Sequence, residues 1–206
     1  MKSKVERYVY NKTIQLIKHG IEVKMHDDIF LDDGIKVQGM FDGFTGTVNI
    51  GMSGDVESWL SIFIHECCHA KQFIDGRKPW VDLGNVYKKK DGAAIFYGWL
   101  AGEEYKLDVV YKAMQLTRAM ELDCEKLTVA EIKKHELDDI INLDDYIRDA
   151  NSYLLFHNVA YITRKWYDQK YKHNKGVEAC LPTTFMKNYD AIPMDFYRAC
   201  IEHCYK

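Results

Sequence analysis

Residues 61–70 read SIFIHECCHA, and this stretch decides how the rest of the chain is interpreted. It contains the pattern H-E-x-x-H within a segment of helical periodicity. On a helix, residues four apart lie on the same face, so His65 and His69 can bind one metal ion. Glu66 follows the first histidine and can act as the general base toward water activated by that metal. The stretch therefore predicts a catalytic metal site carried by a helix.

The helix around this motif has recognisable ends. Ser53 can cap its first turn, Asp55 and Glu57 suit the positive end of the helix dipole, and Asp75-Gly76 is typical of a helix end. Its apolar side chains are predicted to be buried, which places the two histidines beside an apolar face: Leu60, Phe63, Ile64, Cys67 and Cys68.

A small sheet is predicted just before the motif helix. Segments 21–25, 37–41 and 45–50 have strand-like patterns, and turns are expected at Asp32-Asp33-Gly34 and Asp42-Gly43. One strand edge can hold a peptide substrate as an added strand, or the sheet can simply cover the core. Both interpretations remain open at this point.

The remaining segments are mostly helical. We expect helices at 2–18, at 93–137 with a break near Gly102, at 142–171, and from Pro193 to about 205, with a loop over 76–92. Residues 1–206 are therefore expected to form a single domain of the α+β class, mostly helical, with a small sheet preceding the motif helix.

Composition narrows the class of protein. The 206 residues are 47% hydrophobic and 29% charged, with a formal net charge of −3, which does not favour binding to nucleic acid. The basic run 88–90 is expected to be a solvated loop. We find no secretory signal and no apolar run long enough for a membrane span. Six scattered cysteines then indicate reduced thiols and a cytoplasmic location.

A catalytic zinc ion usually has three protein ligands, so a third must come from later in the chain. Glu121 is the preferred candidate, and Glu125, one helical turn later, can support a ligand histidine. Glu104, with Asp108 at the same spacing, is the main rival. Other possible ligands are Asp123, Cys124, His135 and His157. Glu121 can also be an ordinary solvated helix acid.

The combined pattern resembles the gluzincin-type zinc peptidases. Residues 121–125, with 150–153 and 164–167, are similar to metallopeptidases encoded by tailed bacteriophages, and the likeness covers roughly 55–167. The resemblance implies a zincin-like fold, zinc bound by His65, His69 and Glu121, and Glu66 as the general base. It places Glu125 in a supporting position where an Asp is common in the family.

These patterns predict an enzyme, a zinc-dependent hydrolase of a peptide or amide bond in a peptide or protein substrate. Its location would be the host cytoplasm if the chain is phage-encoded. Tyr153, His157 and Arg164 are candidate donors to the oxyanion. An alternative is a zinc-binding regulatory or interaction protein with little or no turnover, and a third hypothesis is that the motif is accidental.

Overall fold

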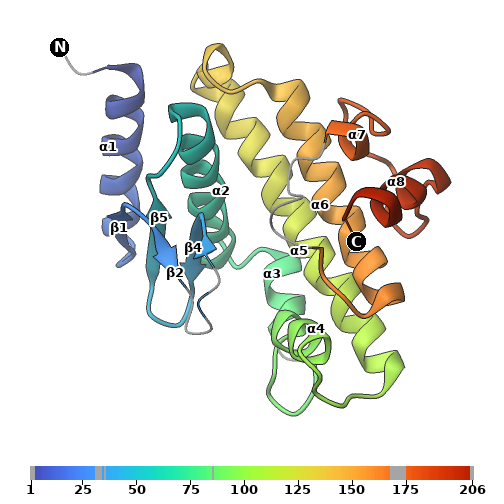
Figure 1. Ribbon diagram of the computed structural model, residues 1–206. Helices are drawn as coiled ribbons and strands as arrows, with labels where there is room; N and C mark the ends of the chain where they lie inside the picture. Colours follow the sequence, from blue (N-terminus) through green and yellow to red (C-terminus); the bar gives the residue numbers. More distant parts are fainter. Residues whose placement is uncertain (1–2, 31–33, 35, 85, 168–174, 205–206) are drawn as a thin grey trace. The chain divides into compact units, whose positions relative to one another are not determined.

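The computed structural model describes residues 3–30, 34, 36–84, 86–167 and 175–204. Helices predominate, and a small mixed sheet precedes the motif helix (Figure 1). Contacts divide the chain into two compact units, one of residues 1–77 and 124–141 and the other of 78–123 and 142–206. The single domain expected from the sequence stays a prediction.

The first unit contains a sheet and the helices beside it. Its elements are α1 (Lys4–Ile17), β1 (Glu22–His26), β2 (Ile29–Phe30), β3 (Lys36–Val37), β4 (Gly39–Asp42), β5 (Thr47–Gly51), α2 (Val56–Ile74), the end of α5 (Leu107–Lys134) and the 3-10 turn η1 (Leu137–Asp139). The second unit contains α3 (Lys78–Leu83), α4 (Gly92–Leu100), the start of α5, α6 (Leu143–Thr163), α7 (Lys175–Glu178) and α8 (Met194–Cys204).

The sheet of the first unit has the strand order β1-β5-β4, so β4 is at its edge. β1 pairs with β5 in parallel and β4 pairs with β5 antiparallel. The central strand buries Val48 and Ile50 completely, and α2 packs on β4 and β5. The expected small sheet before the motif helix is thus confirmed.

Close packing of α2 on β4 depends on one glycine. A methyl group at Gly39 would lie 2.4 Å from Cγ2 of Ile62 and 2.9 Å from Cγ of Glu66. Since real side chains do not approach that closely, only glycine fits here without displacing the helix. Gly39 therefore sets how near Glu66 lies to the strand.

The ends of the motif helix differ in part from the prediction. The N-cap is Asp55, whose carboxylate accepts a hydrogen bond from the Ser58 N–H at 2.8 Å, and Ser53 lies outside the helix. The end is as predicted, with Asp75 as C-cap and Gly76 at φ +57°. The cap assignment was wrong because two capping residues stand two positions apart, and only tertiary context selects between them.

In the second unit, the predicted break near Gly102 separates α4 from α5, and Asn142 caps α6 as expected. The predicted loop 76–92 instead contains the short helix α3, and α6 ends at Thr163, where Arg164 adopts a left-handed conformation. The expected turn at 32–34, apart from Gly34, and the part of the predicted helix beyond 167 lie outside the described residues.

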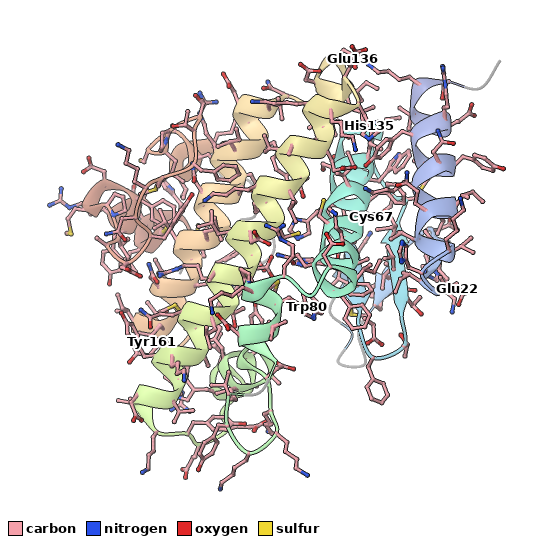
Figure 2. All side chains as sticks on the ribbon, turned by 180° about the vertical axis from the view of Figure 1, so that it is seen from behind. Glu22, Cys67, Trp80, His135, Glu136 and Tyr161 are labelled. Atoms are coloured by element: carbon pink, nitrogen blue, oxygen red, sulfur yellow. The ribbon has the colours of Figure 1, made fainter. Side chains whose placement is uncertain are left out.

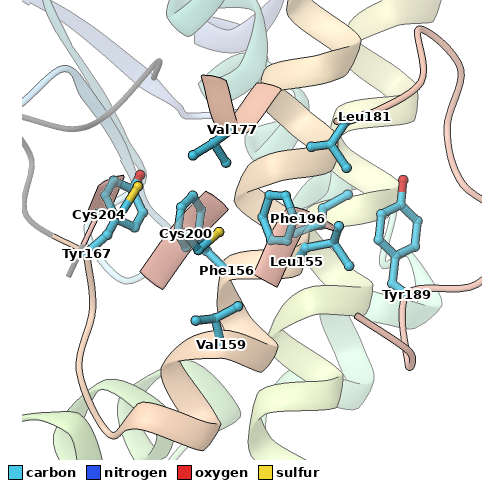
Figure 3. Close-up of a cluster of buried hydrophobic side chains, with 11 residues drawn as sticks. Leu155, Phe156, Val159, Tyr167, Val177, Leu181, Tyr189, Phe196, Cys200 and Cys204 are labelled. Atoms are coloured by element: carbon cyan, nitrogen blue, oxygen red, sulfur yellow. The ribbon is translucent and has the colours of Figure 1, made fainter. Parts of the chain in front are cut away.

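Buried side chains from α6, α7 and α8 form a core in this unit (Figure 3). Phe156 and Phe196 pack edge to face with ring centroids 5.6 Å apart. Cys200 and Cys204 lie in the same cluster and, like the other four cysteines, are free thiols. Among the helices described, none is both long and apolar enough to cross a membrane.

Candidate metal centre

Helix α2 brings the two motif histidines together. The ring centroids of His65 and His69 are 4.6 Å apart with an interplanar angle of 88°, as expected for side chains one helical turn apart. His69 is buried, and the side chain of His65 keeps 15% of its surface exposed. The pair therefore lies near the surface of the first unit without being open on all sides.

Both histidines have an oxygen atom close to Nδ1. Nδ1 of His69 is 2.9 Å from Oε1 of Gln72, and Nδ1 of His65 is 3.5 Å from Oε1 of Glu125. With an amide oxygen as acceptor, Nδ1 of His69 carries the proton and Nε2 keeps its lone pair. Ligand histidines in metal sites are typically oriented in this way by a partner at the second ring nitrogen.

Cys124 also belongs to this cluster. Its Sγ is 3.7 Å from Nδ1 of His65 and donates to the His65 carbonyl oxygen at 3.3 Å. One ligand atom each from His65, His69 and Cys124 lie within 4.8 Å of one another. Sulfur and nitrogen ligands of one tetrahedral zinc ion are separated by about 3.6 Å, given bond lengths of about 2.3 and 2.0 Å. The donor set thus fits a metal ion.

Glu66 is on the side of α2 that faces the sheet. Its carboxylate is buried and accepts a hydrogen bond from the Phe41 N–H at 2.8 Å. This bond fixes Glu66 against the edge strand β4, at the helical position next to His65. Glu66 as the general base stays a prediction.

Glu121, the preferred third ligand, lies on α5 and belongs to the second unit. It is buried, whereas an ordinary solvated acid on a helix surface would be exposed. Its carboxylate is near His157, where it opposes the effect of burial; burial nevertheless lowers the pKa of His157 to about 4. Glu121 as a metal ligand stays a prediction.

The other ligand candidates differ in exposure. Glu104 and Asp108 are exposed, and Asp123 is half-buried. His135 is also exposed, and its ring contacts that of Tyr8 edge to face, with centroids 4.9 Å apart, in the first unit. Of all the rivals, only Cys124 is found in a three-residue cluster with His65 and His69 among the described residues.

The three candidate oxyanion donors all lie in the second unit. Nδ1 of His157 is 3.0 Å from the Tyr153 carbonyl oxygen, and the two rings are 5.0 Å apart. Arg164 stacks at 5.1 Å on Trp99 and donates from Nε to the Trp99 carbonyl oxygen. Any role of these residues in catalysis stays a prediction.

Sequence reasoning missed Gln72 and Gly39. Gln72 is completely buried, although glutamine is usually exposed, and its position three residues after His69 was the available signal. Gly39 had no comparable signal, because its importance arises from the approach of α2.

No protein-family model, no curated protein and no solved structure matches this chain. What can be concluded is that a His65–His69–Cys124 cluster on α2 and α5 is able to hold a metal ion.

Proposed function

We propose that this chain is a gluzincin-like, zinc-dependent hydrolase of a peptide or amide bond. His65 and His69 hold the metal, and Glu66 is the general base. The observation that carries this proposal is the hydrogen bond between Nδ1 of His69 and Gln72, which puts the proton on Nδ1 and the lone pair on Nε2, on a helix that also carries the buried side chain of Glu66. An accidental motif would have no reason to contain this support.

For the third ligand we retain Glu121, with Cys124 as the alternative. The thiol of Cys124 faces Nδ1 of His65 and the His65 carbonyl oxygen, on the same side of the ring as Glu125. This supports a role for Cys124 in orienting His65, with Nε2 of His65 as the metal ligand. The sequence-based prediction of Glu121 gives a ligand set of two histidines and one glutamate, as in several zinc peptidases.

Bound zinc supplies Lewis acidity, which lowers the pKa of water toward neutrality and polarises a carbonyl group. Glu66 accepts the proton of the attacking water and donates it to the departing nitrogen. Because β4 is the edge of its sheet and Phe41 bonds to Glu66, a peptide extended along β4 reaches the general base.

The test of catalysis uses Glu66→Gln, with Glu57→Gln in the first turn of the same helix as the matched control. Zinc-loaded wild-type protein and both variants are incubated with a mixed peptide library, and products are followed by mass spectrometry. We expect Glu66→Gln to retain zinc but lose cleavage, and Glu57→Gln to retain both. Cleavage that survives Glu66→Gln would remove Glu66 as the base.

The third ligand is tested with cobalt in place of zinc. Thiolate ligation gives a sulfur-to-cobalt charge-transfer band in the near ultraviolet, whereas a histidine and carboxylate set does not. We expect no such band in the wild-type protein and loss of metal in Glu121→Gln. A strong band that disappears in Cys124→Ser would instead assign the thiolate.

The alternative function is a metal-stabilised regulatory or interaction protein. The complete burial of Cys124 beside the histidines favours it, because closed sites rich in cysteine and histidine are typical of structural zinc. Under this alternative, the cobalt spectrum shows thiolate ligation, and Glu66→Gln changes no measured property of the protein.

A further inference from the structure

A second candidate site lies within the second unit, in a hollow of about 450 Å³ formed by residues of α5, α6, α8 and the segment before α8. This volume is in the range of small-molecule sites, which span roughly 300–1,000 Å³. Its lining combines three tyrosines, Tyr111, Tyr161 and Tyr197, with apolar side chains that include Met114, Ile162 and Met194.

The tyrosines supply aromatic surface to this hollow. The rings of Tyr111 and Tyr161 are 5.4 Å apart, and Tyr161, labelled in Figure 2, is also 5.8 Å from Trp99. These two tilted ring contacts hold Tyr161 in place. Aromatic faces carry negative electrostatic potential, so a cation over such rings is attracted to them, most strongly where water is excluded.

One residue among those lining the hollow carries a charge, and it is the carboxylate of Asp190. Its Oδ1 forms an ion pair with Arg118, which is buried and does not line the hollow, so the carboxylate charge is partly compensated from the protein side while its oxygens still face the hollow. Arg118 also donates to Oδ1 of Asn158 and to the Tyr189 carbonyl oxygen. These bonds fix Asp190, whose side chain keeps 61% of its surface exposed.

The lining therefore favours a ligand that is positively charged and also has an apolar surface. An anion would meet the carboxylate and the negative ring faces. A small hydrated cation would lose its water shell against methionine and isoleucine without enough oxygen ligands to replace it. An ammonium group with methyl substituents satisfies both demands, because its charge is spread over an apolar surface.

The geometry points to a binding site for an organic cation of the alkylammonium class, held between Tyr111, Tyr161, Tyr197 and the carboxylate of Asp190. Exposed apolar residues at the rim, Ile162 and Met194, each 60% accessible, would contact the substituent that follows the cationic group. This proposal uses residues of the second unit alone and does not depend on the proposed hydrolase function.

The test compares choline with its uncharged isostere 3,3-dimethylbutan-1-ol, in which a tert-butyl group replaces trimethylammonium. Binding to the full chain is followed by heteronuclear NMR titration at constant ionic strength. We expect choline to shift resonances of the lining residues and to bind about tenfold more tightly than the isostere, a difference of about 1.4 kcal/mol that lies within the range of cation–π attraction.

Two variants locate the site. Tyr161→Leu and Tyr197→Leu keep apolar volume but remove an aromatic face, and each is expected to weaken choline binding several-fold while leaving binding of the isostere largely unchanged. Ile201→Leu, at an exposed apolar position of α8 outside the hollow, is the control and is expected to leave choline binding unchanged. Equal binding of the two probes, no binding of either, or shifts confined to residues outside the hollow would each overturn the proposal.

Discussion

The two sides of helix α2 both bury ionisable groups, but they arrange them in opposite ways. On one side, Nζ of Lys12 lies 2.6 Å from the carboxylate of Glu131, a cation matched to an anion. On the other, His65, His69 and Cys124 bring together atoms that all offer lone pairs when deprotonated. Cys67 and Cys68, between the histidines in sequence, face the first of these environments.

This comparison distinguishes buried polar groups that stabilise the fold from buried polar groups that are arranged to bind a ligand. A paired charge is satisfied by the protein itself, and the cost of removing each ion from water is offset by its partner. Nitrogen and sulfur atoms that lie close enough together to share one ion are stabilised most when they bind a metal. Burial raises the pKa of the Cys68 thiol to about 12, so this cysteine stays neutral at physiological pH and remains inert.

The largest effect is expected on the paired side. Lys12→Met leaves the Glu131 charge largely buried, and we expect a loss of about 3 kcal/mol in unfolding free energy. Urea unfolding followed by circular dichroism measures it. The exposed pair of Lys4 and Asp139 gives the matched control, since Lys4→Met should change stability much less. Adding Glu131→Leu to Lys12→Met should restore most of the loss, and zinc binding should be unaffected throughout.

On the histidine side, stability should depend on metal. Zinc at a hundred times its Kd is expected to raise the unfolding free energy of the wild type by about 2.7 kcal/mol. His69→Ala should abolish this increase, whereas His135→Ala, which removes an exposed histidine, should keep it. The measurement is urea unfolding with and without zinc. Equal stabilisation of wild type and His69→Ala would show that zinc binds elsewhere.

A finer test concerns the orientation of His69. Gln72→Met preserves volume but removes the oxygen that accepts from Nδ1, so zinc affinity is expected to fall about 10- to 100-fold. Gln72→Glu keeps an acceptor and should bind zinc close to the wild-type level. Competition with a chromophoric chelator gives both affinities. If Gln72→Met binds zinc as tightly as the wild type, the orienting role is wrong.

The ion pair and the histidine cluster on the two sides of α2 should respond to acid at different pH values. Burial tends to raise the pKa of Glu131, but the bond and charge of Lys12 outweigh it and lower the pKa below its ordinary value of 4.5. The folded state thus favours the carboxylate, so this stabilisation is present above pH 4.5 and is lost as pH falls further. Zinc should be released at higher pH, because histidine ligands must be deprotonated.

Two measurements over the same pH range test this. Acid unfolding of the metal-free protein gives the pH at which stability is lost, and a separate titration gives the pH at which zinc is released. The double variant Lys12→Met with Glu131→Leu is expected to lose less stability than the wild type below pH 4.5 while releasing zinc at the wild-type pH. Zinc release and loss of stability at one common pH in the wild type would contradict the separation.

These same residues show which features of the molecule could be predicted from the sequence. The spacing of His65 and His69, the burial of Cys67 and Cys68, and the preceding sheet all follow from periodicity along one chain segment. Such local patterns are encoded within a few residues and need no knowledge of packing.

The contacts that join distant segments were harder to predict. Cys124 reaches His65 across 59 positions, and Gly39 matters only because α2 lies against β4. Cys124 was named as a rival ligand, but no property of its neighbours in the sequence placed it ahead of Glu121. Tertiary contacts of this kind depend on how elements pack, which composition and spacing do not specify.

The smallest effect is expected at the N-cap of α2, where the prediction from sequence was wrong. This cap bears on both environments of buried ionisable groups, because α2 contributes to both. Asp55 accepts the Ser58 N–H, so Asp55→Ala should lower the melting temperature by about 2 °C. Ser53→Ala, at the position predicted from sequence, removes a hydrogen bond to the Asp28 carboxylate but no helix cap, so its loss should be smaller. Thermal unfolding of the two variants decides between the caps. A larger loss in Ser53→Ala would restore the original assignment and move the start of α2 two residues earlier, while the spacing of the histidines would stay the same.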